Sequence, residues 1–416
     1  MNSNMESRDF DPGRDADAMC RIWREIGWLE DKKSHRESLS LYLEACRTRV
    51  CEVHGEAEIA VSTLPGTMRV LDQELPLSVV AGVYAGRVGR QQGHATTLTA
   101  ECVARDAVEG AAVSTLGIFD SGFYDRLGFG LAPLGRSATI DPRSLKVPRA
   151  TRPPLRFGLD DAEALHACHL ARRPIHGQVK ISDARRIRYE MNFNEEAFVL
   201  GYRDGSDDAI SHFIALSPDG KGEHGPYLVW IISWSTREQF LELLGVLKSL
   251  GDQVHGFRIQ DQQGISMQDL VDRPFTWYRV TRDSPFQKRT LALSSMQNRI
   301  CDLPRCVEAV SLPGADLAFN LQLSDPIADH LPGDSAWRGV GGDWIVRFDA
   351  TSSARPGRDD DLPTLEADVG AFTRLWLGGQ PAGNLSISAN LRGPAELIDA
   401  LDRRYLLPTP RIDDNY

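Results

Sequence analysis

A polar loop at residues 86–93 stands between an apolar, strand-like run at 79–85 and an amphipathic run that follows it. Where a strand passes through a loop into a helix, the backbone N–H groups of the loop and the positive end of the helix dipole favour an anion. Gly93 lets the backbone approach a phosphate closely, Ala95 is equally small, and Arg90 can add a charge-assisted hydrogen bond. The segment therefore predicts a pyrophosphate site, and an ordinary strand–loop–helix turn is the alternative.

The spacing of this loop excludes two common nucleotide-binding motifs. It lacks both the GxxxxGK[ST] spacing of a P-loop and the GxGxxG spacing of a Rossmann fold. Other catalytic patterns are missing too: the chain has no GxSxG elbow, its 10 histidines form no catalytic set, and its 7 cysteines include no CxxC pair. We therefore expect no metal site, and we interpret the cysteines as buried free thiols of a reducing compartment.

The composition is that of an acidic globular protein. The chain has 416 residues, of which 42% are hydrophobic and 25% are charged, so wholesale disorder is excluded. The formal charge of −11 argues against nucleic acid as a partner and fits a cationic small molecule or a basic protein tail better. The sequence has neither a run of about 18 apolar residues nor an apolar N-terminal h-region, so we expect a cytoplasmic protein with no membrane partner.

Periodicity divides the chain into three units of the α/β class with mixed sheets. We place them at residues 1–145, 155–285 and 293–416, with a proline- and arginine-rich linker between the first two. The order helix, helix, strands, helix, strand recurs in the first two units, which indicates a duplicated domain. The last elements expected in the third unit are a helix at 365–377, a strand at 385–391 and a helix at 395–405.

Three segments of the sequence resemble one known family. Arg90-x-x-Gly93-x-Ala95 after an apolar strand resembles the Q/R-x-x-G-x-G/A acetyl-CoA loop of the GCN5-related N-acetyltransferases. Residues 119–130 (FDSGFYDRLGFG) are similar to the Y-x-R-x-G-[FY]-G segment of the enhanced-intracellular-survival (Eis) branch, and residues 372–379 (FTRLWLGG) resemble a helix of its sterol-carrier-like domain. The resemblance spans essentially the whole chain. It implies tandem acetyltransferase domains, the second of them degenerate, followed by a sterol-carrier-like α+β domain.

The resemblance implies an acetyl-CoA-dependent N-acetyltransferase that needs no metal. Val83 and Ala85 would run beside the pantetheine arm like a strand partner. Tyr124 would be the general acid for the leaving thiolate, which suits a phenol because its pKa of about 10 is close to that of a thiol. The terminal carboxylate, on Tyr416, would be the general base. The pyrophosphate cradle would consist of Arg90, Gln91, Gln92, Gly93, His94, Ala95 and Thr96.

The resemblance leaves the acceptor open among amines: a polyamine, an aminoglycoside-like compound or a lysine. Asp413, Asp414 and the terminal carboxylate would form an acidic mouth suited to a protonated amine. Trp28, Glu30 and Asp31, after the first expected helix, would form a second acidic and aromatic wall. Both clusters point to a small-molecule amine as the partner.

Glycine stands at position 82, where Eis-like enzymes often carry a bulky residue, and this predicts space for a larger acyl donor. Because family members commonly assemble as hexamers, we expect a homo-oligomer. Two functions without turnover are alternatives. One is a protein that binds an apolar ligand in its third unit beside a vestigial acetyltransferase unit, and the other is a regulator that binds acetyl-CoA.

Overall fold

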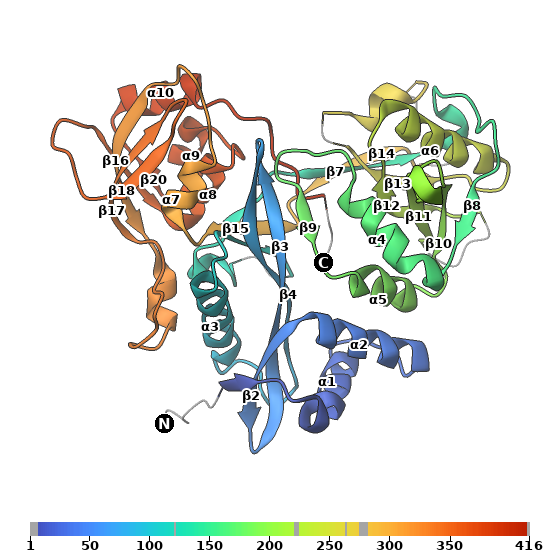
Figure 1. Cartoon of the computed structure of the whole chain (residues 1–416), viewed down its shortest axis with the longest axis horizontal. Helices are drawn as coiled ribbons and strands as arrows, with labels where there is room; N and C mark the ends of the chain where they lie inside the picture. Colours follow the sequence, from blue (N-terminus) through green and yellow to red (C-terminus); the bar gives the residue numbers. More distant parts are fainter. Residues whose placement is uncertain (1–6, 120–121, 220–223, 263, 274–281, 414–416) are drawn as a thin grey trace.

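The computed structural model describes residues 7–119, 122–219, 224–262, 264–273 and 282–413 as three β-sheets with helices packed on them (Figure 1). The sheets contain eight, seven and five strands. Each of them combines antiparallel pairs with a parallel pair. This is the α/β class with mixed sheets that the sequence predicts.

The first sheet is built around a long hairpin. Its strand order is β1-β2-β3-β4-β5-β15-β6, and β9 pairs with β3 beside this path. β3 (Glu56–Val70) runs without a break through Pro65 and Gly66, two residue types that often mark a turn, and β4 (Gln73–Ala85) returns along it. The other strands are β1 (Ser7–Asp9), β2 (Arg47–Val53), β5 (Val113–Gly117), β6 (Gly130–Leu131), β9 (Val179–Ile181) and β15 (Met296–Ile300).

Helices cover both faces of this sheet. α1 (Pro12–Glu25) and α2 (Lys33–Ala45) share one apolar core with Val79 of β4. α3 (His94–Val108) lies in a separate core with Val80 of the same strand. Since side chains alternate between the faces of a strand, the two cores lie on opposite sides of the sheet, as Figure 1 shows.

The second sheet has the order β14-β7-β13-β12-β11-β10-β8. Its helices are α4 (Ala162–Leu170), α5 (Arg185–Phe193) and α6 (Arg237–Ser249). The last of these begins with a reciprocal capping box between Thr236 and Gln239, a strong start signal in the sequence. The strands are β7 (Gly135–Ile140), β8 (Leu155–Phe157), β10 (Phe198–Tyr202), β11 (His212–Pro218), β12 (Tyr227–Ser233), β13 (Phe257–Gln260) and β14 (Arg289–Leu293).

The third sheet differs from the sequence prediction near its end. Its order is β18-β17-β16-β19-β20, in β16 (Leu317–Ser324), β17 (Gly342–Phe348), β18 (Ser353–Pro356), β19 (Thr364–Asp368) and β20 (Leu391–Arg392). The helix expected at 365–377 begins only at α8 (Val369–Trp376), because Asp368 caps it by accepting from the Ala371 N–H at 2.7 Å. The strand expected at 385–391 is mostly helix, in α9. The remaining helices are α7 (Leu303–Glu308), α9 (Ala382–Ser388) and α10 (Ala395–Arg404).

Three strands are exchanged between the units. β7 precedes residue 145, yet it pairs with β13 and β14 in the second sheet. β9 belongs by sequence to the second unit but pairs with β3, and β15 follows residue 293 but lies between β5 and β6 in the first sheet. The first two sheets therefore each contain strands from more than one unit, whereas the third sheet is continuous in sequence from β16 to β20.

His176 lies where the three units meet. Its Nδ1 accepts from the Leu71 N–H at 3.1 Å, and its Nε2 donates to the Leu377 carbonyl at 2.9 Å. Its own carbonyl accepts from the Arg411 N–H at 2.9 Å. An acceptor on one ring nitrogen and a donor on the other require the neutral ring, and burial lowers the pKa of His176 below its usual value.

This lowered pKa makes stability depend on pH. The unfolded chain takes up a proton on this ring near pH 6.5, while the folded chain takes it up only at lower pH. Above that pH, the neutral ring therefore contributes fully to the free energy of unfolding. As the pH drops below it toward the folded pKa, the free energy of unfolding falls by up to about 1.4 kcal/mol per pH unit. Urea unfolding at about pH 7.5 and about pH 5.5 should show a smaller loss in His176→Gln than in the wild type. An equal loss in both proteins would contradict the assignment.

None of the described helices is long and apolar enough to cross a membrane. All seven cysteines lie in described ranges with free thiols. Burial raises the pKa of the Cys102 and Cys301 thiols to about 12. These two thiols are therefore protonated and unreactive at neutral pH.

Candidate active site

β4 separates from β5 in the middle of the first sheet. The parallel pairing of the two strands covers residues 77–80 against 113–116. β4 continues to Ala85, and along 81–85 only β3 pairs with it among the described residues. A β-bulge at the same place leaves Ala81 unpaired between the paired positions 80 and 82. On the side away from β3, the backbone of this stretch can therefore pair with an extended ligand.

The loop after β4 ends at an uncapped helix N-terminus. Gly93 is the N-cap of α3 in a left-handed conformation with a φ of 81°, and no side chain of the described residues caps the helix. Arg90, Gln91 and Gln92 are exposed in front of it. The first N–H groups of α3 thus point out of the helix toward this loop, as an anion site requires. Of the other predicted cradle residues, His94 and Ala95 are half-buried, and Thr96 is buried in the first turn.

Tyr124 lies on the α3 face of the sheet, inside a ring of aromatic side chains. Its exposed fraction is 2%, and its ring makes edge-to-face contacts with Phe119, Phe123 and Phe129 at centroid distances of 6.0, 4.8 and 6.1 Å. It precedes the short 3-10 helix η1 (Asp125–Leu127), and its carbonyl accepts from the Leu127 N–H at 2.9 Å. The tyrosine is held at one end of a tight turn.

One apolar cluster joins the predicted cofactor and acid residues. Tyr124 is a buried member of it, and Val83, Ala85 and Ala95 pack against it as half-buried residues. The gap in the sheet, the start of α3 and the tyrosine therefore border the same side of β4. These residues are 41 positions or fewer apart in sequence but come from three separate elements.

The other face of β4 corrects the prediction for Gly82. A Cβ atom at this position would lie 2.6 Å from the Tyr42 hydroxyl and 3.1 Å from the Tyr84 ring. The two tyrosines therefore fill the space beside this glycine, and no larger acyl pocket opens there. Sequence reasoning missed Tyr42 because it stands in the apolar stripe of α2 and carries no separate signal.

These two tyrosines form a buried polar group beside the bulge. The Tyr84 hydroxyl bonds Ser62 at 3.1 Å, and Ser62 bonds Thr48 at 2.8 Å. Within the described part of the chain, the Tyr42 hydroxyl has no hydrogen-bond partner of good geometry. Burial raises the pKa of Tyr42 and of Tyr84 well above the usual range, so both stay protonated at neutral pH.

Of the residues predicted to form the substrate wall, only Trp28 reaches the strand. Its ring lies 5.4 Å from Trp23 and 6.0 Å from Tyr84, and it is 46% exposed. Glu30 pairs with Lys32 at 2.9 Å and Asp31 pairs with Arg36 at 2.7 Å, both at the surface. These cations lower the pKa of each carboxyl.

The C-terminal segment is anchored to the second unit through Asp413. Its carboxylate accepts from Arg172 Nε at 2.8 Å and Nη2 at 2.9 Å, and from Gln178 Nε2 at 3.1 Å. The Val179 N–H at 3.3 Å completes this shell. Asp413 is thus already neutralised by a cation, and nothing in the sequence could show a partner 241 residues away. Asp414 and Tyr416 lie outside the described residues.

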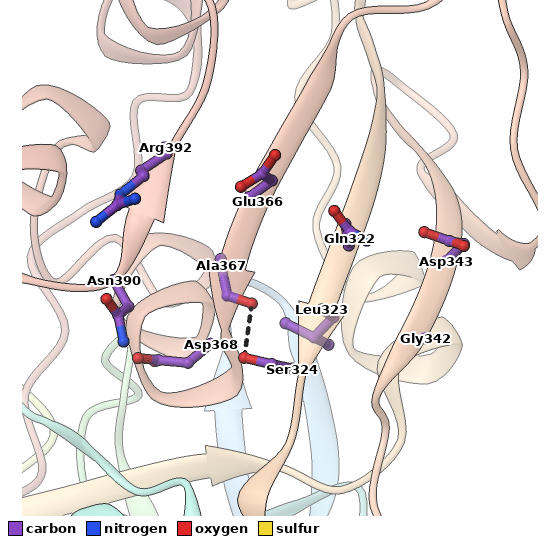
Figure 2. A pocket seen from close by; sticks show the side chains of 10 residues that line it. All are labelled: Gln322, Leu323, Ser324, Gly342, Asp343, Glu366, Ala367, Asp368, Asn390 and Arg392. Carbon is purple, nitrogen blue, oxygen red and sulfur yellow. Dashed lines mark hydrogen bonds between the residues drawn. The ribbon is translucent and has the colours of Figure 1, made fainter.

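The third unit carries a groove of about 470 Å³ on the outer face of its sheet (Figure 2). Charged side chains on neighbouring strands line it, among them Asp343, Glu366, Asp368 and Arg392. An apolar ligand would need an apolar lining, so this groove does not favour the alternative of an apolar-ligand carrier.

A second polar cluster lies in the second unit. Asp204, His212 and Glu242 bring ligand atoms within 4.8 Å of one another, as a metal site would require. The Arg152 guanidinium pairs with Asp204 at 2.5 Å and with Glu242 at 2.8 Å. The two carboxylates therefore already share a cation of the chain.

Comparison with known proteins identifies the fold. A scan against protein-family models and a search of curated proteins gave no match. A conserved protein of unknown function from Enterococcus faecalis, described as a probable N-acyltransferase, aligns over 100% of both chains with 19% identity and a TM-score of 0.76. A GCN5-related N-acetyltransferase from Anabaena variabilis aligns over 99% of this chain and 100% of its own, with 12% identity and a TM-score of 0.76.

Eis1 from Mycobacterium abscessus aligns over 99% of this chain and 100% of its own, with 16% identity and a TM-score of 0.73. At identities this low, the structural similarity establishes the fold, and the activity has to be argued from the site. Over 99–100% of its length, the chain has the fold of these three solved structures, one of which is a GCN5-related N-acetyltransferase.

Proposed function

We propose that this protein is an acetyl-CoA-dependent N-acetyltransferase with an amine acceptor. One observation carries the proposal: β4 leaves β5 at a bulge, and the uncapped start of α3 and Tyr124 border that same opening. An extended pantetheine needs a strand edge, a pyrophosphate needs free N–H groups, and a leaving thiolate needs a proton donor. The residues present therefore fit acetyl-CoA.

Different groups of the chain contact different parts of acetyl-CoA along this opening. The N–H groups at the start of α3 and the Arg90 side chain bind the pyrophosphate. The backbone at Val83 and Ala85 pairs with the pantetheine arm, and an N–H group beside the bulge polarises the thioester carbonyl. These contacts hold the thioester in place for attack by the amine nitrogen.

Proton movements complete the transfer. As the new C–N bond forms and the C–S bond breaks, the Tyr124 hydroxyl gives its proton to the departing thiolate. The carboxylate of Tyr416 takes the proton that the amine loses, directly or through one water. The products are an N-acetylated amine and free CoA, and no metal is needed for either proton transfer.

The acceptor is a small cationic molecule. Trp28 presents a half-exposed indole beside the end of β4, and the net charge of −11 attracts cations to the protein as a whole. An indole face and a protonated amine attract each other by cation–π interaction. A polyamine, an aminoglycoside-like compound or a lysine side chain has this chemistry.

The first test measures thiol release from acetyl-CoA against a panel of polyamines, aminoglycosides, amino acids and lysine peptides. Turnover with one amine class supports the proposal and fixes that class. Binding of acetyl-CoA by calorimetry without thiol release from any amine would replace the enzyme by an acetyl-CoA-binding regulator. Absence of both binding and release would refute the proposed site.

Two glycines that flank α3 provide a matched test of the pyrophosphate cradle. Gly93 at the start and Gly110 beyond the end both have a positive φ, of 81° and 104°, and open space where a Cβ atom would lie. Alanine at either position costs about 1–2 kcal/mol of backbone strain. We expect Gly93→Ala to weaken acetyl-CoA binding at least tenfold in calorimetry, because the loop must leave its conformation. Gly110→Ala should leave binding unchanged, and equal effects would contradict the assignment.

A further inference from the structure

The turn that carries Tyr124 is held from β15, a strand that enters the first sheet after the second unit. β15 pairs with β5 on one side and with β6 on the other. Two of its side chains, Gln297 and Arg299, stand two positions apart and so point to the same face of the sheet. Both are buried, with exposed fractions of 1% and 0%.

These two side chains bind the two ends of η1. Gln297 Nε2 donates to Asp125 Oδ1 at 2.6 Å, and Arg299 Nη1 donates to the Leu127 carbonyl. The Leu127 and Phe129 N–H groups in turn donate to the Tyr124 carbonyl at 2.9 and 3.3 Å. The backbone of the tyrosine is therefore fixed through hydrogen bonds that end on β15.

The third unit holds the arginine in place. Arg299 Nη2 pairs with Asp325 at 2.7 Å, and the side chain of this aspartate is 1% exposed. Asp325 also accepts from the Val340 N–H at 2.9 Å and from the Ile327 N–H at 3.2 Å. The guanidinium lies against the Trp337 ring at 5.1 Å from its centroid. At this depth, a movement that separated the two groups would leave each charge buried without a partner. The ion pair therefore holds Arg299 in a single arrangement.

The turn also has no room to move away. A Cβ atom on Gly128 would lie 2.3 Å from Val369 Cγ1, and one on Gly130 would lie 2.2 Å from the Gly370 carbonyl oxygen. Both contacts are to the start of α8 in the third unit. The glycines thus bring the Tyr124 turn directly against that helix.

We propose that Arg299, locked by Asp325, is a positioning residue that sets the hydroxyl of Tyr124 for proton transfer. The third unit thereby takes part in the reaction without touching acetyl-CoA or the amine. This inference rests on the proposed function. Arginine suits the role because its guanidinium stays charged at every working pH and donates in a fixed, planar geometry.

The test is a double-mutant cycle on the full chain. Arg299→Met should lower kcat at least tenfold while the KM for acetyl-CoA stays within twofold, and Arg299→Lys should recover part of the loss. In the Tyr124→Phe background, Arg299→Met should cause no further loss, because the hydroxyl that it positions is already gone. A loss of the same size in that background would overturn the proposal.

Two more variants keep the test decisive. If Arg299→Met does not fold, Gln297→Met, which removes only the bond to Asp125, enters the same cycle with the same expected outcome. Arg203→Gln breaks a half-exposed ion pair with Asp161 in the second unit and serves as the control for general destabilisation. An equal fall of kcat in this control would overturn the proposal. If Tyr124→Phe itself keeps full activity, the acid assignment fails and the positioning role falls with it, whereas a loss in Tyr124→Phe without one in Arg299→Met overturns the positioning role alone.

Discussion

Replacing Tyr124 by phenylalanine should lower kcat by about 100- to 10,000-fold, the usual contribution of one general acid. The substitution removes only the hydroxyl, so the edge-to-face contacts with Phe119, Phe123 and Phe129 remain. The thiolate must then leave without a proton donor. Steady-state thiol release, measured beside calorimetry with acetyl-CoA, should show a lost rate with unchanged cofactor affinity.

Phe123→Leu is the matched control for this variant. It disturbs the same aromatic cluster but keeps the hydroxyl, so its kcat should fall by less than tenfold. The acid assignment is wrong if Tyr124→Phe retains the wild-type rate, or if its acetyl-CoA affinity falls in step with its rate. The second result would mean that the tyrosine binds the cofactor instead of protonating the thiolate.

A chain that lacks Asn415 and Tyr416 should lose activity by a comparable factor. The anchor on Arg172 holds Asp413, and Tyr416 is only the third residue beyond it. Removing two residues therefore shortens the reach of the terminal carboxylate by up to about 7 Å while the anchor stays intact. Without its base, the attacking nitrogen has no acceptor for the proton that it loses on forming the amide, and we expect kcat to fall by about 100-fold or more.

Tyr416→Phe separates the carboxylate from the side chain. It keeps the length of the chain, the aromatic ring and the terminal carboxylate, so it should retain wild-type turnover. A truncated chain with the wild-type rate would place the base elsewhere. Loss of activity in both variants would assign the role to the phenol of Tyr416.

The sequence predicts local features of the site well. The start of α3 follows from Gly93 and the apolar stripe after it, because a helix start is encoded within a few residues. The fold class is also predicted correctly, since the alternation of helices and strands is visible in the periodicity.

Features that depend on distant partners could not be predicted. Asp413 looks like a free acid until Arg172 appears beside it, and Gly82 looks like open space until Tyr42 fills it. The apolar residues around Leu385 fit a strand or a helix equally well, and tertiary packing decides for α9. The strand exchange likewise could not be predicted, because the residues of a strand do not by themselves determine which sheet it joins.

The exchange of β15 has a consequence for synthesis of the chain. Gln297 is 182 residues beyond Thr115, its neighbour on β5. At about 5–20 residues per second, the edge of β5 waits roughly 10–35 s for its partner strand. During that time the backbone N–H and C=O groups along the edge of β5 have no partner strand, and such an edge is prone to aggregation. Expression of residues 1–145 alone should therefore give an insoluble product, and ribosome-bound chains should need a chaperone until residue 300 has emerged.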